Sequence, residues 1–141
     1  MSADPIVNAR PLSRIVVPAP RPGLDMAAGY GWVQSAAIRA GDYVFVSGVV
    51  AVDPESGARL NGTLTSEAHR AFQNLKLVLE SAGSSLERLV QVRAMIYDRI
   101  EYDALNRVYR QYLPSGPPAR TVWSVRIADA FKVQLDAIAV V

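Results

Sequence analysis

Arg120 is the side chain whose type and position best suit ligand binding. It follows the segment Pro117-Pro118-Ala119, which proline makes rigid, and it stands at the start of a predicted strand. A guanidinium group presents a planar fork of N–H donors that matches the two oxygens of a carboxylate. The position also suits a solvated arginine at a strand end, or an interface ion pair. Taken by itself, the residue favours this structural interpretation.

The sequence offers few other groups for catalysis or metal binding. The 141 residues include no cysteine, which excludes disulfides, thiolate zinc sites and a cysteine nucleophile. The single histidine, His69, cannot form a histidine metal cluster. It lies beside the apolar stripe of a predicted helix, so we expect it at the surface without a catalytic role. We expect neither a metal nor a cofactor.

Charge and hydropathy narrow the range of partners. The formal charge is +2, and the basic residues are spread along the chain without a basic run, so nucleic-acid binding is not expected. No apolar stretch is long enough to cross a bilayer. The start of the chain, Met1 to Arg10, lacks the pattern of a signal peptide. These features predict a soluble, cytoplasmic protein.

The chain divides near residue 31. Residues 1–31 are rich in proline and glycine and are predicted to form an extension, in which only Arg14 to Val17 resembles a strand. The first dozen residues are expected to be mobile. The predicted domain covers residues 32–141 and begins with a hairpin, because residues 33–39 alternate in polarity and residues 43–52 form an apolar run.

Two amphipathic helices follow from the spacing of apolar residues. The first is expected to begin at Thr65 or Ser66 and to stop at Gly83; the second is capped by Asp98 and ends before Pro114. The apolar stripe of the first helix consists of Ala68, Ala71, Phe72, Leu75, Val78, Leu79 and Ala82.

Three further strands are predicted, at residues 90–97, 120–127 and 131–141. The element order is then β-β-β-α-β-α-β-β. Two amphipathic helices need one sheet face to cover, so the pattern predicts an α+β domain with a single sheet and both helices on one side.

The last predicted strand carries apolar residues on both faces. Ala139 and Val141 point one way, whereas Ile138 and Val140 point the other. Helices cover only one side, so a partner subunit is the simplest cover for the other. The alternative is a strand with a few exposed aliphatic side chains. We expect an oligomer.

Four stretches of the sequence carry a family resemblance through their order and spacing. They are Tyr43-Val44-Phe45-Val46-Ser47-Gly48 followed by Asp53-Pro54-Glu55-Ser56-Gly57; Phe72-Gln73-Asn74-Leu75-Lys76 to Ala82-Gly83; Asn106-Arg107-Val108-Tyr109; and Pro117-Pro118-Ala119-Arg120 with Asp136-Ala137-Ile138-Ala139. Together they resemble the reactive intermediate deaminase (Rid) family, also called YjgF-like, over residues 33–141.

The resemblance implies a fold, an assembly and a reaction. The fold is a chorismate-mutase-like α+β sheet, and the assembly is a homotrimer with a barrel-like centre and clefts between neighbouring subunits. The reaction is hydrolysis of 2-imino or enamino acids to 2-keto acids and ammonia, without a cofactor. One alternative is a trimer that binds small carboxylates without turnover. An endoribonuclease is disfavoured by the modest charge and by the lack of a His or Lys pair.

The resemblance also assigns residues to the cleft. It implies that Arg120 clamps the substrate carboxylate and that Ser47 lines the cleft, although a serine there could simply bond nearby backbone. Gly48 would let a ligand or a neighbouring backbone approach closely. Val122 or Trp123 is expected to shape specificity, and Trp123 could instead belong to the core.

The sequence departs from the family at a tyrosine that its deaminases often carry. Counted without gaps from Gly41, that place is Gln34; with a shift of two residues, Trp32 to Gln34 could align instead. Neither alignment supplies a phenol. Tyr30 is nearby and would need a suitable loop geometry to act as a substitute.

A second departure concerns the glutamate implied to handle the attacking water, whose place is Gln134. An amide can orient a water molecule but cannot accept its proton at neutral pH. Asp136 lies about 6–7 Å further along the same strand face and could serve, or could pair with an arginine. We therefore expect weak deamination, with Arg120 and Gln134 as the residues that decide it.

Overall fold

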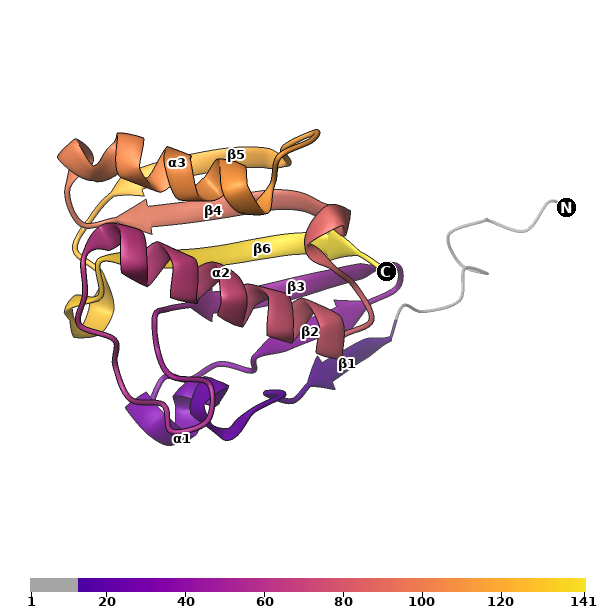
Figure 1. Ribbon diagram of the computed structural model, residues 1–141. Helices are drawn as coiled ribbons and strands as arrows, with labels where there is room; N and C mark the ends of the chain where they lie inside the picture. Colours follow the sequence, from indigo (N-terminus) through magenta and orange to yellow (C-terminus); the bar gives the residue numbers. More distant parts are fainter. Residues whose placement is uncertain (1–12) are drawn as a thin grey trace, which may run out of the picture.

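The computed structural model describes residues 13–141, and the expected mobility of the first dozen residues lies outside this range. One mixed sheet carries the helices on one face, in the strand order β1-β2-β3-β6-β4-β5 (Figure 1). This confirms the fold class expected from the sequence pattern. The strands are β1 (Arg14–Val17), β2 (Ala37–Ala40), β3 (Tyr43–Val49), β4 (Leu89–Ile96), β5 (Ala119–Ser124) and β6 (Val133–Val140), and the α-helices are α1 (Met26–Tyr30), α2 (Leu64–Ser81) and α3 (Tyr102–Tyr112).

The described part of the predicted extension packs with the rest of the molecule. Strand β1 pairs antiparallel with β2 at the edge of the sheet. Leu24 and Met26, from the short segment around α1, are buried in the common core. Residues 14–31 are therefore part of the same packed unit as residues 32–141.

The first hairpin is shorter than expected. Strand β2 begins at Ala37, because the chain turns just before it: the N–H of Gln34 donates to the carbonyl of Trp32, at 3.0 Å. Strand β3 ends at Val49 rather than at residue 52, and its pairing with β6 is irregular between Val46 and Val49. These changes leave residues 34–36 free to line a pocket beside the sheet.

Helix α2 begins one residue before the expected caps and confirms the predicted stripe. Its N-cap is Thr63, whose hydroxyl oxygen accepts the N–H of Ser66 at 3.2 Å, rather than Thr65 or Ser66. Leu64 is almost fully buried, so packing adds it to the apolar face of the helix. The helix ends at Ser81, and Gly83, the predicted stop, follows two residues later with a positive φ of 85°.

A 3₁₀ turn precedes helix α3. Asp98 accepts the N–H of Ile100 at 3.0 Å, and it thereby caps a 3₁₀ turn, Arg99–Glu101, rather than the α-helix itself. Helix α3 then runs antiparallel to β4 and β5 on the same side of the sheet as α2 (Figure 1). Within residues 13–141, no helix is long and apolar enough to cross a membrane.

The two faces of the sheet differ in what covers them. Alternate residues of β6 beginning at Val133 are buried under the helices, whereas those beginning at Gln134 are only half-buried. On the second face, Phe45 lies opposite Ile138 and Tyr43 opposite Val140. Phe45 and Tyr43 are 45% and 47% exposed. We call this uncovered side the open face.

A buried amide joins α2 to the segment that follows β3. The Nδ2 of Asn74 donates to the carbonyls of Val50 and Val52, at 3.0 and 2.9 Å, and the side chain is fully buried. Asn74→Leu would leave both carbonyls without that donor. We expect a loss of about 2–3 kcal/mol in the free energy of unfolding, measured by urea at fixed protein concentration.

Gln73→Leu is the matched control for this prediction, because Gln73 is an exposed neighbour on the same helix. It should change the free energy of unfolding by less than about 0.5 kcal/mol. An equal effect of the two substitutions would contradict the proposed role of the Asn74 bonds.

Candidate functional site

Arg120 lies on the helix-covered side of the sheet, at its edge. It belongs to β5, which pairs in parallel with β4, and it stands opposite Val92. Val92 is fully buried under the helices, and residues opposite each other in a sheet share a face. Arg120 therefore points toward α3 rather than toward the open face.

Helix α3 fixes the guanidinium group of Arg120. Its Nη1 donates to Oδ1 of Asn106 at 2.7 Å, and its Nη2 donates to the hydroxyl of Tyr102 at 3.0 Å. The guanidinium carbon also lies 4.8 Å from the ring centre of Tyr109. An arginine has five N–H donors, so three remain without a partner among the described residues. The group is held in place and can still bind an anion.

Tyr109 supplies a buried wall behind this group. Its hydroxyl is buried and has no hydrogen-bond partner within residues 13–141. Burial raises the pKa of Tyr109, and the nearby charge of Arg120 opposes that rise. The tyrosine therefore stays protonated and packs as a neutral ring beside the cation.

A hollow opens on one side of Arg120, and Val122 is one of the residues that line it. Its other lining residues are Ile96, Arg99, Tyr102, Arg120 and Ser124. Trp123 points the other way: it stands opposite Met95, on the open face, and is 42% exposed. Trp123 is therefore not a core residue of the single chain.

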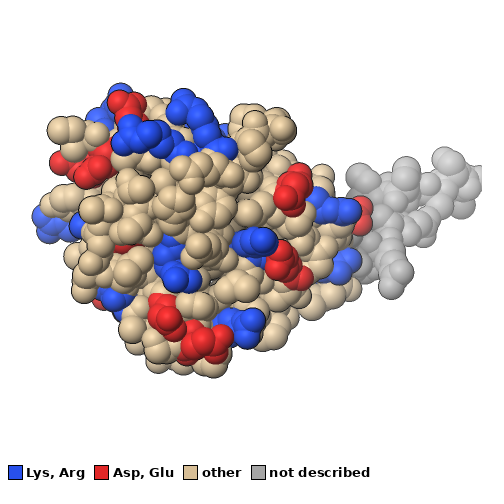
Figure 2. Space-filling view, in the orientation of Figure 1, with Lys and Arg blue, Asp and Glu red and all other residues tan. Residues whose placement is uncertain are grey.

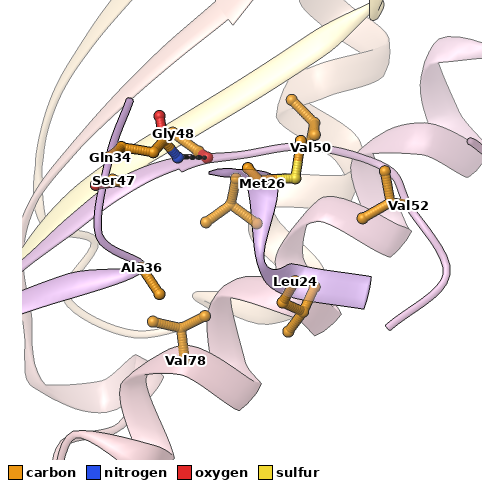
Figure 3. A pocket seen from close by; sticks show the side chains of 10 residues that line it. Leu24, Met26, Gln34, Ala36, Ser47, Gly48, Val50, Val52 and Val78 are labelled. Carbon is orange, nitrogen blue, oxygen red and sulfur yellow. Dashed lines mark hydrogen bonds between the residues drawn. The ribbon is translucent and has the colours of Figure 1, made fainter. Parts of the chain in front are cut away.

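A second group of predicted residues gathers where β3 is irregular (Figure 3). Gln34, Ser47 and Gly48 line one small pocket, closed on its other sides by apolar side chains such as Met26 and Val78. The Nε2 of Gln34 lies 3.4 Å from the carbonyl oxygen of Gly48, to which it donates. The hydroxyl of Ser47 donates to the carbonyl of Ser35 at 2.6 Å. This is the kind of bond to nearby backbone that the sequence left open as an alternative to a role in the cleft.

Gly48 and Gln134 lie in direct contact. A Cβ atom at position 48 would stand only 2.5 Å from Nε2 of Gln134. Glycine is thus the residue that lets the Gln134 side chain cross this part of β3. The arrangement places Gln134 on the open face, beside Ser47 and Gly48.

Asp136, the other candidate for proton transfer, is engaged in an ion pair. Its Oδ1 accepts the Nε–H of Arg93 at 2.7 Å, and its side chain is 18% exposed. This bond, together with the attraction of the two charges, raises the pKa of Arg93. Of the two roles open for Asp136, the structure therefore shows the pairing with an arginine.

Neither aromatic residue near the missing tyrosine offers a free phenol. The indole of Trp32 donates to Oδ2 of Asp129 at 2.8 Å and packs edge-on against Phe131. The hydroxyl of Tyr30 donates to the carbonyl of Gly57 at 2.9 Å. Gln34, and not Trp32, is the residue that reaches Gly48.

The two groups do not meet within one chain. Arg120 faces α3, whereas Gln134 stands opposite Met95 and Met95 opposite Trp123, on the open face and nearer the other end of the strands. The sheet itself separates them. Within a single subunit, Arg120 and Gln134 therefore point to opposite sides of the sheet.

The partners of Arg120 on α3 were not among the expected site residues. Tyr102, Asn106 and Tyr109 are spaced i, i+4 and i+7, which places them on one face of a helix. A polar and aromatic stripe of this kind is a detectable signal. To place these three residues beside Arg120 from the sequence, one would need only the additional assumption that α3 packs beside β5.

Comparisons with known proteins show which family and fold the chain resembles. A family model described as Endoribonuclease L-PSP matches residues 24–141. A RutC family protein of Pyrococcus abyssi is 34% identical over 74% of this chain and 84% of its own length. A goat protein named 2-iminobutanoate/2-iminopropanoate deaminase is 33% identical over 69% of this chain and 72% of its own length.

The fold has close counterparts among solved structures. The crystal structure of RidA from an Antarctic Psychrobacter is 28% identical, with a TM-score of 0.75. The match covers 78% of this chain and 89% of that one.

Proposed function

Because this chain belongs to the Endoribonuclease L-PSP family, which includes the Rid and YjgF-like proteins, we propose that it hydrolyses 2-imino or enamino acids. The products are 2-keto acids and ammonia. The proposal is supported by relatives at about 30% identity that are named 2-iminobutanoate/2-iminopropanoate deaminases. The assignment of the chain to the family does not depend on this proposed activity.

One observation carries the proposal: Arg120 is fixed by α3 and keeps free donors beside a partly apolar hollow. Asn106 and Tyr102 hold two of its N–H groups, and Ile96 and Val122 line the hollow with aliphatic side chains. A fixed guanidinium binds a carboxylate in one orientation. An aliphatic wall suits the carbon chain of a small imino acid.

The reaction needs little from the protein beyond orientation and proton transfer. A water oxygen bonds to the carbon of the C=N group and one water proton moves to the nitrogen. The hydroxyl proton of this tetrahedral intermediate then also moves to the nitrogen, and the C–N bond breaks to release ammonia as the C=O bond forms. Arg120 can hold the acid group but remains protonated, so it cannot accept the water proton. Gln134 can orient a water molecule through its amide oxygen.

We propose that the complete site lies between two subunits of a homotrimer. In a single chain the sheet separates Arg120 from Gln134 and Ser47, so a neighbouring copy is needed to bring such groups together. The open face offers a surface for this contact. It carries half-exposed aromatic rings, Tyr43 and Phe45, together with Trp123.

Light scattering tests this assembly. We expect a trimer for the native chain at micromolar concentration and a monomer for Phe45→Glu. In Phe45→Glu, each copy would lose the burial of a phenylalanine side chain, which stabilises the contact by roughly 1.5–3 kcal/mol. Each copy would also place a charged carboxylate in the contact. Gln73→Glu, on the helix-covered side, should remain trimeric. A native monomer, or a trimeric Phe45→Glu, would contradict the assembly.

Gln134 supports a second candidate function, that of a carboxylate-binding trimer without turnover. It occupies the position where the family resemblance implies a glutamate, and Asp136 is already paired with Arg93. Imines made in situ by an amino-acid oxidase separate the two functions. Deamination requires keto-acid and ammonia release faster than spontaneous hydrolysis. Binding of 2-keto acids without faster release identifies a binding protein.

Endoribonuclease activity, the description attached to the family model, has less support from these residues. His69 is half-buried where α2 meets α3, rather than at the surface as expected: its Nδ1 lies 3.1 Å from the hydroxyl of Tyr112, and the two rings pack edge-on. On the face that Figure 2 shows, several basic side chains gather at the upper edge beside acidic ones and the others are scattered among acidic ones, so no continuous basic stripe crosses the face. RNA cleavage by the native protein that survives in Arg120→Ala but not in His69→Ala would favour the nuclease.

A further inference from the structure

Tyr102 lies between two arginine side chains. The guanidinium carbon of Arg99 is 4.8 Å from its ring centre, and that of Arg120 is 5.6 Å away. The Nη2 of Arg120 also donates to the hydroxyl oxygen of Tyr102, at 3.0 Å. One aromatic ring therefore positions both cations, since guanidinium groups pack favourably against aromatic rings.

The two arginines line the same hollow. Its other residues are aliphatic or neutral: Ile96, Val122 and Ser124, besides Tyr102 itself. No acidic side chain is among the described residues that line it. Within residues 13–141, Arg99 forms no ion pair, and Arg120 bonds only to the neutral groups of Asn106 and Tyr102. The hollow thus holds two positive charges, and no carboxylate of the described residues lines it or forms an ion pair with either arginine.

Arg99 has no part in the reaction proposed above, which needs one cation for one carboxylate. It is the first residue of the 3₁₀ turn that Asp98 caps, so its backbone is fixed relative to β4. The distances to the shared ring place the two guanidinium carbons at most about 10 Å apart. Each carboxylate approaches its guanidinium with N–H···O distances of about 2.7–2.9 Å. A short diacid can therefore reach both cations.

We propose that Arg99 forms a second carboxylate position and that the site selects 2-imino dicarboxylic acids of four or five carbons. This inference rests on the proposed function, because it takes Arg120 as the clamp for the carboxylate next to the imine carbon. The distal carboxylate pairs with Arg99, and the intervening carbons lie against Val122. The reaction at the C=N bond is the same as for a monoacid.

A pair of ligands that differ only in the distal carboxylate tests the selection. Calorimetry on the full-length native protein compares 2-oxoglutarate with 2-oxopentanoate, which has the same carbon chain and one acid group. We expect tighter binding of 2-oxoglutarate. Arg99→Gln should weaken its binding about tenfold and leave 2-oxopentanoate nearly unchanged, because one charge-assisted contact is lost.

Arg107→Gln is the matched control: it removes the same charge from an exposed position on α3 that does not line the hollow. It should change neither affinity appreciably. Equal losses for both ligands in Arg99→Gln, or equal effects of Arg99→Gln and Arg107→Gln, would overturn the second position. So would equal binding of the two keto acids by the native protein.

Turnover separates failure of this inference from failure of the proposed function. Imines are generated from acidic amino acids and from 2-aminopentanoate by suitable flavin oxidases, and keto-acid release is followed. Hydrolysis of the monoacid imine alone retains the deaminase and rejects the diacid preference. Selective, Arg99-dependent binding of 2-oxoglutarate without any turnover retains the second carboxylate position and rejects the deaminase. Absence of both binding and turnover rejects both proposals.

Discussion

Gln134→Glu is expected to raise the rate of 2-imino acid hydrolysis by about 10²–10⁴-fold, the usual contribution of a positioned general acid or base. Glutamate has nearly the shape of glutamine, so it can follow the same path over Gly48, where no Cβ atom obstructs it. The substitution changes one group at that place: an amide becomes a carboxylate. A carboxylate can accept the proton of the attacking water and return it to nitrogen.

The neighbours of position 134 bear on whether the new carboxylate stays ionised. Asp136, two residues away on the same face, is already balanced by Arg93 at 2.7 Å. In a cleft shared by two subunits, Arg120 of the adjoining copy would add a positive charge, and a nearby opposite charge favours the ionised form of a carboxyl group. In an isolated chain that contribution is absent, because Arg120 lies on the other side of the sheet.

Gln91→Glu serves as the control for this gain. Gln91 lies opposite Ile138 on the open face, so the same change of charge is made away from Gly48. Initial rates on imines formed in situ compare the native protein and the two variants. A native protein as fast as Gln134→Glu would mean that another group, such as a main-chain carbonyl, already handles the water.

Arg120→Ala is expected to weaken the binding of small 2-keto acids by about ten- to a hundredfold. A hydrogen bond to a charged group contributes roughly 1.5–3 kcal/mol, and about 1.4 kcal/mol corresponds to a factor of ten in affinity. The loss should appear in calorimetry as a change in Kd, with turnover falling in parallel. Arg120→Lys keeps the charge but loses the planar fork, so its affinity should lie between those of the native protein and Arg120→Ala.

Arg120 also contacts the rings of Tyr102 and Tyr109, so its removal could disturb α3. Circular dichroism and light scattering establish whether the fold and assembly persist. Arg107→Ala removes a neighbouring charge on α3 from an exposed position that lines neither of the hollows beside Arg120. It should bind keto acids nearly as the native protein does. Unchanged affinity in a folded Arg120→Ala would show that the arginine is structural.

Local periodicity in the sequence determined the elements and their order. The apolar stripe of α2 and the alternation along β6 are visible without a structure, because helices repeat every 3.6 residues and strands every two. The same patterns required one sheet with both helices on one face. The family resemblance supplied Arg120, Ser47 and Gln134 as candidates. The same resemblance supplied Gln34, as the place of the family tyrosine when counted back from Gly41.

Only the tertiary structure decided which side of the sheet each candidate occupies. Alternation along β5 assigns Arg120 and Thr121 to opposite faces, but pairing with Val92 is what places Arg120 under α3. The register of β4 and β6 likewise brings Arg93 to Asp136 across 43 positions of sequence. Sequence periodicity carries no information on register between distant strands, because register depends on how whole faces are buried. For the same physical reason, the separation of Arg120 from Gln134 and the two arginines beside Tyr102 emerged only from the folded chain.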